Sequence, residues 1–542
     1  MVLAGGGHSH AVLLQRWAMV GTPKGLGITL VNRSSTALYS GTVPGLIGGL
    51  YQQRECRIDL RRLAEVAGVS LIVAEITGLE LQRQQLLLRN RPPVRWDLLS
   101  LDVGAVTAPA TTQAGDPIPE LAEGLAIKPL EPFLCWWGSS RNAETPITVV
   151  GDGAAGLEVT LALAGHGRRH GNVRRIQLLS RHFPPPQPFG AALRQAGIEL
   201  GENGLPNLEA TVLLCTGSRA PAWLAASGLP CDPASGRVLT SNTLQVQDQP
   251  GIYASGDCAQ IDSDPRPPAG VWAVRSAAPL ALNLERAAQG LPGRAWHPPR
   301  WALLLLGDGG AVTGHPRAMA QWGPLRTPFH PLLWRLKQAI DRRFMHRFEG
   351  LAIGAMDPTQ SSESDGSMSC HGCAAKLAAA PLAQAIAAAL PPQPVAEDAH
   401  PLLVATDGST WWQSVDGFPA LVSDPWLNGR LTTLHACSDL WACGATVHSA
   451  LAVVSLPRQA ESLQAELLAQ ILAGIRSVLD PLGAALLGGH TLQAVGLGAE
   501  TALPVVQLSV NGTSPAGRAW PKGGLQAGDA LILTRELGSG VL

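Results

Sequence analysis

Residues 147–158 read I-T-V-V-G-D-G-A-A-G-L-E, and this stretch decides how the first part of the chain is built. The four apolar or β-branched residues at its start predict a buried strand. The spacing G-x-G-x-x-G follows at Gly151, Gly153 and Gly156, and Glu158 begins a helical pattern. Glycines with this spacing let the backbone approach a pyrophosphate at a helix N-terminus. The stretch therefore predicts a dinucleotide-binding unit; the alternative is a tight strand–helix turn without a ligand.

A second glycine-rich turn lies near the beginning of the chain. Gly5-Gly6-Gly7 follows the apolar run Val2–Ala4 and precedes a helix expected over Ala11–Val20. Gly5 and Gly7 fit a pyrophosphate-binding turn, but His10 stands where a third glycine is usual, so this motif is weaker evidence. A turn without a ligand is again the alternative. The strand expected next ends at Asn32, whose side chain can accept one ribose hydroxyl at most.

Residues 1–350 alternate short β-rich runs with helical stretches, which is typical of parallel strand–helix–strand units. The strand after the complete glycine motif ends at Ser180-Arg181 without an acidic residue, which permits a 2′-phosphate and favours NADPH. Only about thirty residues separate Arg181 from Val212, so this dinucleotide unit is expected to be shortened. Further strands are expected at Ile28–Val31, Leu71–Ala74, Ile176–Leu179 and Val212–Cys215.

Two later segments complete the pattern of a flavoprotein that binds two dinucleotides. Cys215-Thr216-Gly217 ends an expected strand, and Ile252–Ala259 contains Gly256-Asp257. Together with the two glycine turns, these segments resemble the FAD/NAD(P)-dependent pyridine nucleotide-disulfide oxidoreductase superfamily. Two further segments, Tyr39–Gly45 and Trp96–Gly104, resemble its type II NADH dehydrogenase-like branch.

This resemblance implies an FAD site and an NAD(P)H site, each on a Rossmann-like domain. Hydride would pass from the nicotinamide to the flavin and then to an electron acceptor that the sequence does not identify. Cys56 is not part of a C-x₄-C pair, so a dithiol mechanism is not expected. Asp257 would meet the ribityl chain of the flavin. The residues implied for FAD are Gly5, Gly7, Gly256 and Asp257, and those for NAD(P)H are Gly151, Gly153, Gly156 and Glu158.

The composition of the chain changes near residue 355. Residues 357–366 are polar and predict a linker, and residues 370–376 then read C-H-G-C-A-A-K. A cysteine with a lysine three residues later, followed by dispersed aspartates, suits a soft thiolate working beside Mg²⁺-bound phosphates. The pair Cys370/Cys373 could instead bind zinc or form a redox disulfide.

From Ser369 onward the chain resembles selenophosphate synthetase (selenide, water dikinase), a member of the AIR synthase-like ATP-binding superfamily. The resemblance implies that ATP, selenide and water are converted to selenophosphate, phosphate and AMP. His435 departs from the family, which usually has a small polar residue there. The matching segments are Gly372–Lys376, Glu397–Ala399, Ser414–Phe418, Gly429-Arg430, Ala436–Asp439, Gly488–Thr491 and Gly528–Thr534.

The same resemblance implies roles for individual side chains. Cys373 would handle selenium and Lys376 would bind an ATP phosphate, as the two catalytic residues. Asp398 and Asp439 would hold Mg²⁺. The residues implied for ATP are Lys376, Asp416, Asp439 and a turn formed by Gly489, His490 and Thr491.

These motifs predict an α/β protein in which two Rossmann-like domains precede the N-terminal α+β domain of an AIR synthase-like fold. Helices of that domain are expected over Lys376–Leu390, Arg430–Cys443 and Glu461–Leu479. Ala530–Thr534 predicts a buried strand, so the chain is expected to end inside an incomplete domain. The expected boundaries are 1–140 and 236–355 for the FAD domain with an interface segment, 141–235 for the NAD(P) domain, 356–368 for the linker, 369–512 for the synthetase-like domain and 513–542 for the incomplete one.

Composition and charge exclude several classes of protein. The formal net charge is −1, which gives no electrostatic basis for binding nucleic acid or an anionic membrane. The nine cysteines form no even framework and are expected to be the reduced thiols of a cytoplasmic protein. No apolar run approaches the roughly 20 residues of a membrane span, and the longest, Leu303–Leu306, is expected to be a buried strand.

We therefore expect a bifunctional enzyme whose partners are small molecules, namely selenide, ATP, NAD(P)H and an unidentified electron acceptor. The flavin half could deliver reduced selenide to Cys373, and the synthetase-like domain could form a homodimer. Two alternatives stay open. The C-terminal half could be an inactive remnant on a flavin oxidoreductase, or it could pair with an intact synthetase.

Overall fold

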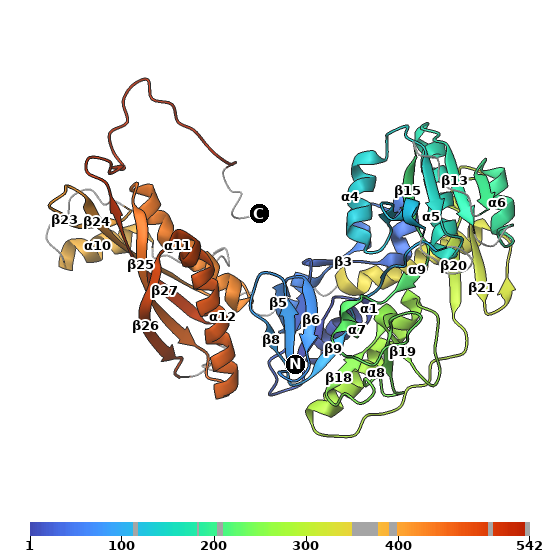
Figure 1. Cartoon of the computed structure of the whole chain (residues 1–542), viewed down its shortest axis with the longest axis horizontal. Coiled ribbons are helices and arrows are strands. Elements are labelled where there is room, and N and C mark those ends of the chain that lie inside the picture. The colour runs from blue at the N-terminus through green and yellow to red at the C-terminus, as the bar shows by residue number, and fades with distance from the viewer. Residues whose placement is uncertain are drawn as a thin grey trace. The chain divides into compact units, whose positions relative to one another are not determined.

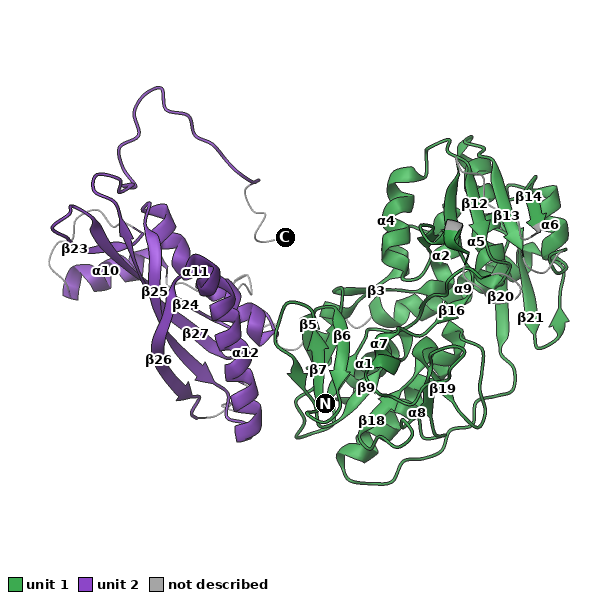
Figure 2. Ribbon diagram, in the orientation of Figure 1, with its two compact units in different colours: residues 1–362 green, residues 363–542 purple. Residues whose placement is uncertain are grey.

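The computed structural model divides into two compact units, residues 1–362 and 363–542 (Figure 2). It describes residues 1–111, 118–180, 184–202, 210–349, 378–389, 398–496 and 502–536. The expected linker at 356–368 and the motif at 370–376, with Cys373 and Lys376, lie outside the described residues. None of the helices within those ranges is long and apolar enough to cross a membrane.

One part of unit 1 is built on a five-stranded parallel sheet in the order β18-β9-β1-β2-β5; Figure 1 labels β5, β9 and β18 of this sheet. Apolar side chains of α1 and α8, among them Leu13, Trp17 and Leu280, pack with Leu3 and Leu30 of the sheet in one core. The strands predicted at 28–31 and 71–74 are present, each shifted by one residue. The elements are β1 (Val2–Ala4), α1 (His8–Val20), β2 (Thr29–Asn32), α3 (Leu60–Val66), β5 (Ser70–Val73), β9 (Leu99–Leu101), β18 (Ile252–Ala254) and α8 (Gly270–Ala288).

A second five-stranded parallel sheet, in the order β11-β15-β12-β13-β14, carries the complete glycine motif. The core of this part joins Val149 and Leu178 of the sheet to Leu157 and Leu161 of α5 and to Phe133 of α4. The predicted strand Ile147–Val150 is confirmed to the residue. The elements are β11 (Leu125–Ala126), α4 (Leu130–Ser140), β12 (Ile147–Val150), α5 (Ala154–His170), β13 (Ile176–Ser180), α6 (Phe189–Gln195), β14 (Glu199–Glu202) and β15 (Thr211–Leu214).

A three-stranded antiparallel sheet and helix α9 complete unit 1. The expectation that Leu303–Leu306 is a buried strand is wrong in one respect. The strand exists as β20, but Leu303 is exposed, because β20 is an edge strand that pairs only with β21 among the described strands. The elements are β20 (Leu303–Gly307), β21 (Ala318–Trp322), β22 (Leu325–Arg326) and α9 (Pro331–Glu349).

Shorter elements connect these layers and border the clefts described below. The strands are β3 (Thr36–Leu38), β4 (Arg57–Asp59), β6 (Ile76–Glu80), β7 (Gln85–Leu88), β8 (Val94–Arg95), β10 (Val106–Thr107), β16 (Ser218–Arg219), β17 (Val238–Thr240) and β19 (Ala259–Ile261). The helices are α2 (Val43–Ile47) and α7 (Trp223–Ala226), with 3₁₀ turns η1 (Ser40–Thr42), η2 (Gln53–Cys56), η3 (Pro119–Leu121) and η4 (Gly256–Cys258).

Unit 2 contains a mixed sheet in the order β23-β24-β27-β25-β26, in which only the β25–β26 pair is parallel. Helices α11 and α12 pack on one face of it, and their residues Leu440, Ile471 and Ile475 share a core with Leu508 and Val510 of the sheet. The predicted helix Glu461–Leu479 is confirmed. The elements are α10 (Ala379–Ala389), β23 (His400–Val404), β24 (Thr410–Pro419), α11 (Pro425–Ala442), β25 (Thr446–Leu456), α12 (Glu461–Leu479), η8 (Asp480–Leu482), β26 (Ala485–Gln493) and β27 (Val505–Ser514).

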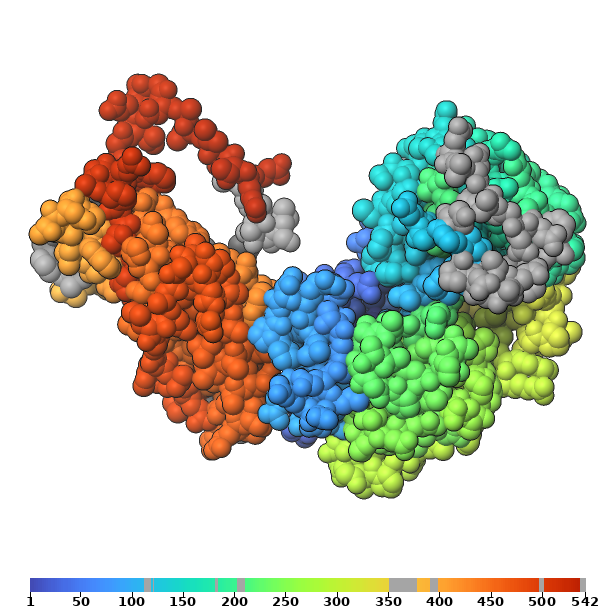
Figure 3. Space-filling model, viewed as in Figure 1, coloured from blue at the N-terminus to red at the C-terminus, as the bar shows by residue number. Residues whose placement is uncertain are grey.

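One predicted helix and one predicted strand of unit 2 differ from the structure. Helix α11 begins at Pro425 rather than Arg430, because the Asp424 side chain caps it by accepting from the backbone N–H groups of Trp426 and Leu427. The buried strand expected at Ala530–Thr534 is wrong. Residues 530–534 form no strand and pair with none of the described strands, and Leu531, Ile532 and Leu533 are exposed. Beyond Lys522, which still contacts Asp398, the described chain leads away from the sheet (Figure 3).

Candidate functional site

A cleft of about 990 Å³ lies at the carboxyl ends of the first parallel sheet. Gly6 and Gly7 line it from the turn after β1, Asp102 from the end of β9, and Asp257 from the segment after β18. Residues 128–131 line the same cleft. Loops at the carboxyl ends of parallel strands converge, so the two predicted FAD segments, far apart in the sequence, border one space. We call this space the first cleft.

Asp102 fills the space between the two glycine segments. A Cβ added to Gly7 or to Gly256 would lie 2.2 Å from Asp102 Oδ1, and one added to Gly5 would lie 2.3 Å from the Asp102 carbonyl oxygen. Gly5 and Gly256 also have positive φ angles of +91° and +70°. These three predicted residues therefore have a steric reason to be glycine.

The Asp102 carboxyl is buried, and its Oδ2 accepts a hydrogen bond from the His10 backbone N–H at 3.1 Å. Burial raises the pKa of Asp102 to about 7, against the opposing effect of hydrogen bonds from His10 and Ser9. Asp102 is missing from the predicted site residues. Its signal in the sequence is an acidic residue directly after the apolar strand β9, at the carboxyl edge of the sheet.

His10 replaces the third glycine for a structural reason. Its imidazole is buried, with Nδ1 2.6 Å from the Gly5 carbonyl oxygen and Nε2 2.8 Å from Ser100 Oγ. Burial lowers the pKa of His10 to about 4, so the ring is neutral near pH 7. The neutral ring contacts Gly5 of the glycine turn through one nitrogen and Ser100 of β9 through the other, so it holds the turn against β9.

Two further polar side chains of the first cleft were not predicted. Lys128 Nζ lies 2.8 Å from Asp257 Oδ2, and both side chains are partly exposed. His8 is partly buried in contact with Tyr39, and its buried Nε2 has no hydrogen-bond partner among the described residues. A glycine-lined cradle with an orphaned ring nitrogen and an ion pair at its wall fits a large polar ligand such as FAD.

Asn32 already has partners within its own chain. Its Oδ1 accepts from the Gly6 N–H at 2.9 Å, and its Nδ2 donates to the Ser34 carbonyl at 2.8 Å. The side chain thus holds the glycine turn against the end of β2. Its contact with a ribose stays a prediction.

A second cleft, of about 760 Å³, lies at the carboxyl ends of the second sheet. Gly151 and Gly153 line it, together with Ser180 and residues 215–217. A Cβ on Gly151, whose φ is +120°, would lie 2.3 Å from the Cys215 carbonyl oxygen, and one on Gly156 would lie 2.0 Å from the Gly151 carbonyl oxygen. The glycines thus allow β12, β15 and α5 to approach closely, as the motif predicts.

Asp152 brings an unpredicted carboxylate into this second cleft. Its Oδ2 accepts a hydrogen bond from Ser180 Oγ at 2.8 Å. Arg181, on which the NADPH preference depends, lies outside the described residues. That preference therefore stays a prediction.

Glu158 lies away from the lining of the second cleft. It is buried, and its Oε1 accepts from the Gly307 N–H at 2.7 Å. Burial raises its pKa to about 7, while Lys337 of α9 opposes that shift. Lys337 Nζ in turn lies 3.1 Å from Asp341 Oδ2, which also accepts from the Tyr51 hydroxyl. The structure places Glu158 in this buried polar group, and its contact with NAD(P)H stays a prediction.

In unit 2, Asp416 and Asp439 come from β24 and α11, and both are already engaged. Asp439 Oδ2 accepts from Ser414 Oγ at 2.5 Å. Asp416 Oδ1 accepts from the Gly417 N–H at 2.9 Å, and its Oδ2 lies 2.6 Å from His435 Nδ1. His435, the residue that departs from the family, therefore contacts the carboxylate predicted to meet ATP.

Both carboxylates predicted to hold Mg²⁺, Asp398 and Asp439, have protein partners in the structure. Asp398 Oδ1 lies 2.7 Å from Lys522 Nζ. No group of three or more His, Cys, Asp or Glu in the described part of the chain is placed to hold a metal ion. Two carboxylates are a suitable donor type for Mg²⁺, and the roles of Asp398 and Asp439 stay predictions.

The turn expected at Gly489-His490-Thr491 is wrong, because these residues lie in strand β26, parallel to β25. A Cβ on Gly489 would lie 1.7 Å from the Ala452 carbonyl oxygen, so close strand pairing requires glycine there. The three residues are exposed. Their contact with ATP stays a prediction.

Residues 388–513 match the family model described as AIR synthase related protein, N-terminal domain. Two similar curated proteins are both described as selenide, water dikinase. The one from Myxococcus xanthus is 34% identical over 180 residues, covering 32% of this chain and 48% of that protein. The one from Rhizobium meliloti is 34% identical over 182 residues, covering 31% and 48%. The chain spans about half the length of these relatives.

Two of the solved structures similar to this chain are redox enzymes. A sulfide:quinone oxidoreductase from Aquifex aeolicus has a TM-score of 0.49 and 13% identity, covering 65% of this chain and 91% of that one. A NAD-dependent persulfide reductase from A. fulgidus has a TM-score of 0.45 and 18% identity, covering 59% and 63%.

Proposed function

We propose that this chain joins an FAD-dependent NAD(P)H oxidoreductase to a selenide, water dikinase. The dikinase half is supported by the match of residues 388–513 and by two relatives at 34% identity. The flavin half is supported by two clefts, each at the carboxyl ends of a parallel sheet and each beside a glycine turn. The single observation that carries the flavin half is the pair of glycine segments that meet around Asp102; the match of residues 388–513 carries the dikinase half.

In the flavin half, backbone N–H groups of the Gly5–Gly7 turn would bind the FAD pyrophosphate, and those of the Gly151–Gly153 turn would bind that of NAD(P)H. Bound FAD would supply a carrier that accepts hydride from the nicotinamide and passes electrons to a second acceptor. Asp257 would accept hydrogen bonds from the ribityl hydroxyls, and its ion pair with Lys128 would orient that carboxylate.

In the dikinase half, the chemistry is phosphoryl transfer, which depends on positioning and charge neutralisation. Cys373 would hold selenide as a thiolate, and Lys376 would neutralise an ATP phosphate. Asp398 and Asp439 would bind Mg²⁺, which would require Asp398 to exchange its contact with Lys522. Asp416 would contact ATP once His435 moves away from it.

A homodimer through unit 2 is part of this proposal. Helices α11 and α12 cover one face of the sheet, and apolar side chains emerge from the other. Trp411, Val415 and Leu451 on that face are 38%, 71% and 45% exposed. An apolar sheet face of this kind suits a second copy of the same domain. Sedimentation of the chain with Val415→Lys, which should be monomeric, tests this part.

Phosphorus NMR of the full chain with Mg-ATP and selenide under anaerobic conditions tests the dikinase. We expect a selenophosphate signal with AMP and phosphate, and none of them from Asp439→Asn. Unchanged ATP with the wild-type chain would contradict the proposal. For the flavin half, we expect a flavin absorption spectrum that bleaches on addition of NADH or NADPH; a colourless chain that does not take up added FAD would contradict it.

A second candidate is a flavin oxidoreductase whose C-terminal unit is inactive and pairs with an intact synthetase. The contacts of His435 with Asp416 and of Lys522 with Asp398 favour it, because they occupy carboxylates that nucleotide and metal need. Absence of AMP formation together with co-purification of a full-length synthetase would support this candidate.

Supply of reduced selenide by the flavin half is a further part of the proposal. A Gly7→Val chain should make less selenophosphate than the wild type when NADPH is the only reductant. Equal yields from the two chains would refute this coupling.

A further inference from the structure

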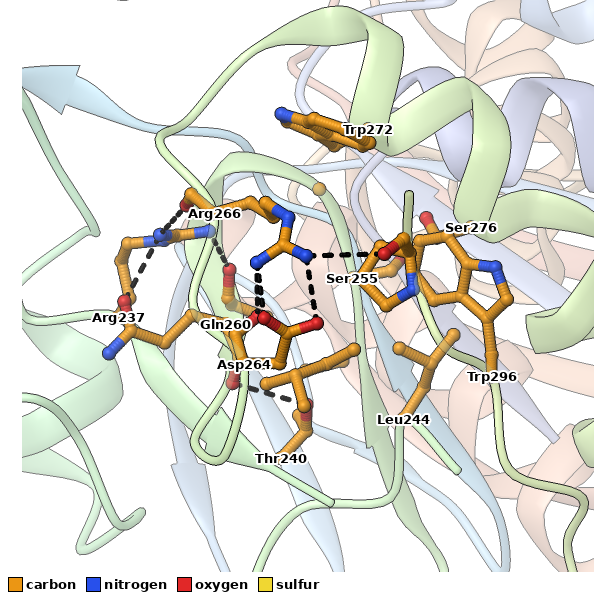
Figure 4. A pocket seen from close by; sticks show the side chains of 15 residues that line it. Arg237, Thr240, Leu244, Ser255, Gln260, Asp264, Arg266, Trp272, Ser276 and Trp296 are labelled. Carbon is orange, nitrogen blue, oxygen red and sulfur yellow. Dashed lines mark hydrogen bonds and ion pairs between the residues drawn. The ribbon is translucent and has the colours of Figure 1, made fainter. Parts of the chain in front are cut away.

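Unit 1 contains a third pocket, which lies apart from the two clefts (Figure 4); its empty space of about 420 Å³ includes the solvent at its open side. It lies between β17, the end of β18, β19 and α8, and we call it the arginine pocket. Its lining shares no residue with the first cleft. Trp272 and Ser276 of α8 line the arginine pocket, whereas Gly270 and Ala273 line the first cleft. The residues that line it include Arg237, Ser255, Asp264, Arg266, Trp272 and Trp296.

Arg237 is a buried cation that forms no ion pair with any of the described residues. It is only 8% exposed, and its guanidinium donates to the side-chain oxygen of Gln260 and to the backbone carbonyl oxygens of Arg266 and Ala259. Its Nε has no hydrogen-bond partner in the described part of the chain. An ionised group buried with only neutral partners is costly, so this position favours an anion.

The second arginine of the pocket is already neutralised. Arg266 Nη2 lies 2.8 Å from Asp264 Oδ2, and the same guanidinium donates to the Pro298 carbonyl. Figure 4 shows this ion pair between Arg237 on one side and Leu244 and Trp296 on the other. Among the residues that line the pocket, Asp264 is the one carboxylate, and it pairs with Arg266. Arg237 forms no ion pair in the described part of the chain, although the charges of Asp232 and Asp257 outside the lining also act on it.

The rest of the lining is largely apolar. Leu244, Ile261 and Trp296 line the pocket, and Ser255 Oγ is buried in it without a hydrogen-bond partner among the described residues. Ser255 is 3% exposed. A concave apolar lining with a few unpaired polar atoms is the usual composition of a small-molecule site.

We propose that the arginine pocket binds a small monocarboxylate with an apolar body, such as an aromatic acid. Asp264 pairs with Arg266, and the ligand's carboxylate would pair with Arg237. Its apolar body lies against Leu244 and Trp296. Ser255 Oγ offers a donor that no described protein group uses.

Calorimetric titration of the full chain with benzoate tests this proposal, with benzamide as a neutral probe of the same shape. We expect the Kd of benzoate to be at least about tenfold lower than that of benzamide, the change expected for one charged hydrogen bond. Arg237→Gln should raise the Kd of benzoate by a similar factor, whereas Arg300→Gln, which changes an exposed arginine outside the pocket, should alter it less than about twofold.

Ser255→Ala provides a second variant, because it deletes an unpaired hydroxyl and should therefore leave the fold intact. We expect a several-fold higher Kd for benzoate with this variant. In crystals soaked with 4-bromobenzoate, the bromine should lie between Leu244 and Trp296. Equal binding of benzoate and benzamide, no binding of benzoate, or a bromine position outside the arginine pocket would each overturn the proposal.

Discussion

Asp102 should make the stability of unit 1 depend on pH in a way that Asp102→Asn removes. Its pKa is about 7 in the folded chain, against an ordinary value of 3.8. The folded state thus binds the proton more tightly than the unfolded state between these values. Stability contributed by the protonated carboxyl is complete below about pH 4 and is lost as the pH rises through about 7. One pKa unit corresponds to about 1.4 kcal/mol, so the loss is roughly 4 kcal/mol at most.

Urea unfolding of the full chain, followed by tryptophan fluorescence at several pH values between about 4.5 and 7.5, measures this effect. We expect the wild type to lose stability relative to Asp102→Asn across this range, because asparagine can still accept from the His10 N–H but does not titrate. Glu123→Gln changes an exposed carboxyl, so its free energy of unfolding should depend on pH in the same way as that of the wild type. Parallel pH profiles of the wild type and Asp102→Asn, within about 1 kcal/mol, would refute the reasoning.

Three further predictions concern the other sites. Gly156→Ala should lower the free energy of unfolding by roughly 1–3 kcal/mol and weaken NAD(P)H binding, because the added Cβ would lie 2.0 Å from the Gly151 carbonyl oxygen. Gly153→Ala is the control: its added Cβ would have nothing within 4 Å, so the melting temperature should equal that of the wild type. His435→Ser should tighten ATP binding several-fold in calorimetry by freeing Asp416; unchanged affinity would mean that this contact does not compete with the nucleotide. Asp439→Asn should abolish AMP formation in phosphorus NMR, while Ser414→Ala, which removes only the donor to Asp439, should retain it.

Elements set by local pattern were predictable from the sequence. The strand Ile147–Val150 and the helix Glu461–Leu479 appear as expected, because an apolar run bounded by glycine and a long amphipathic stretch each carry their own signal. The glycines of both dinucleotide motifs were identified for the same reason. Their spacing reflects a local requirement, namely close approach of a turn to a neighbouring strand.

Features that depend on distant partners were not predictable. Asp102 and Lys128 line the first cleft only in the folded protein, because the cleft forms when strands β1, β9 and β18, far apart in the sequence, pair with one another. The segment 530–534 has a strand-like pattern but no partner strand among the described residues, and the pattern alone cannot supply one. Gly489 reads like a turn residue, yet its role is to let two strands pair closely.

The Asp102 side chain also makes the residues that are acceptable at positions 7, 102 and 256 depend on one another. The same carboxyl oxygen stands 2.2 Å from the space that a side chain would need at Gly7 and at Gly256. A larger residue at Gly7 becomes tolerable only if the side chain at position 102 is smaller, whereas at Gly256 the φ of +70° adds a strain that a smaller residue at position 102 does not remove. Substitutions at positions 7 and 102 should therefore be accepted in combination and rejected singly, and Gly256 should resist substitution in either background. A combinatorial library of the three codons would show this as epistasis, and recombination between distant homologues would preserve the trio or lose the fold.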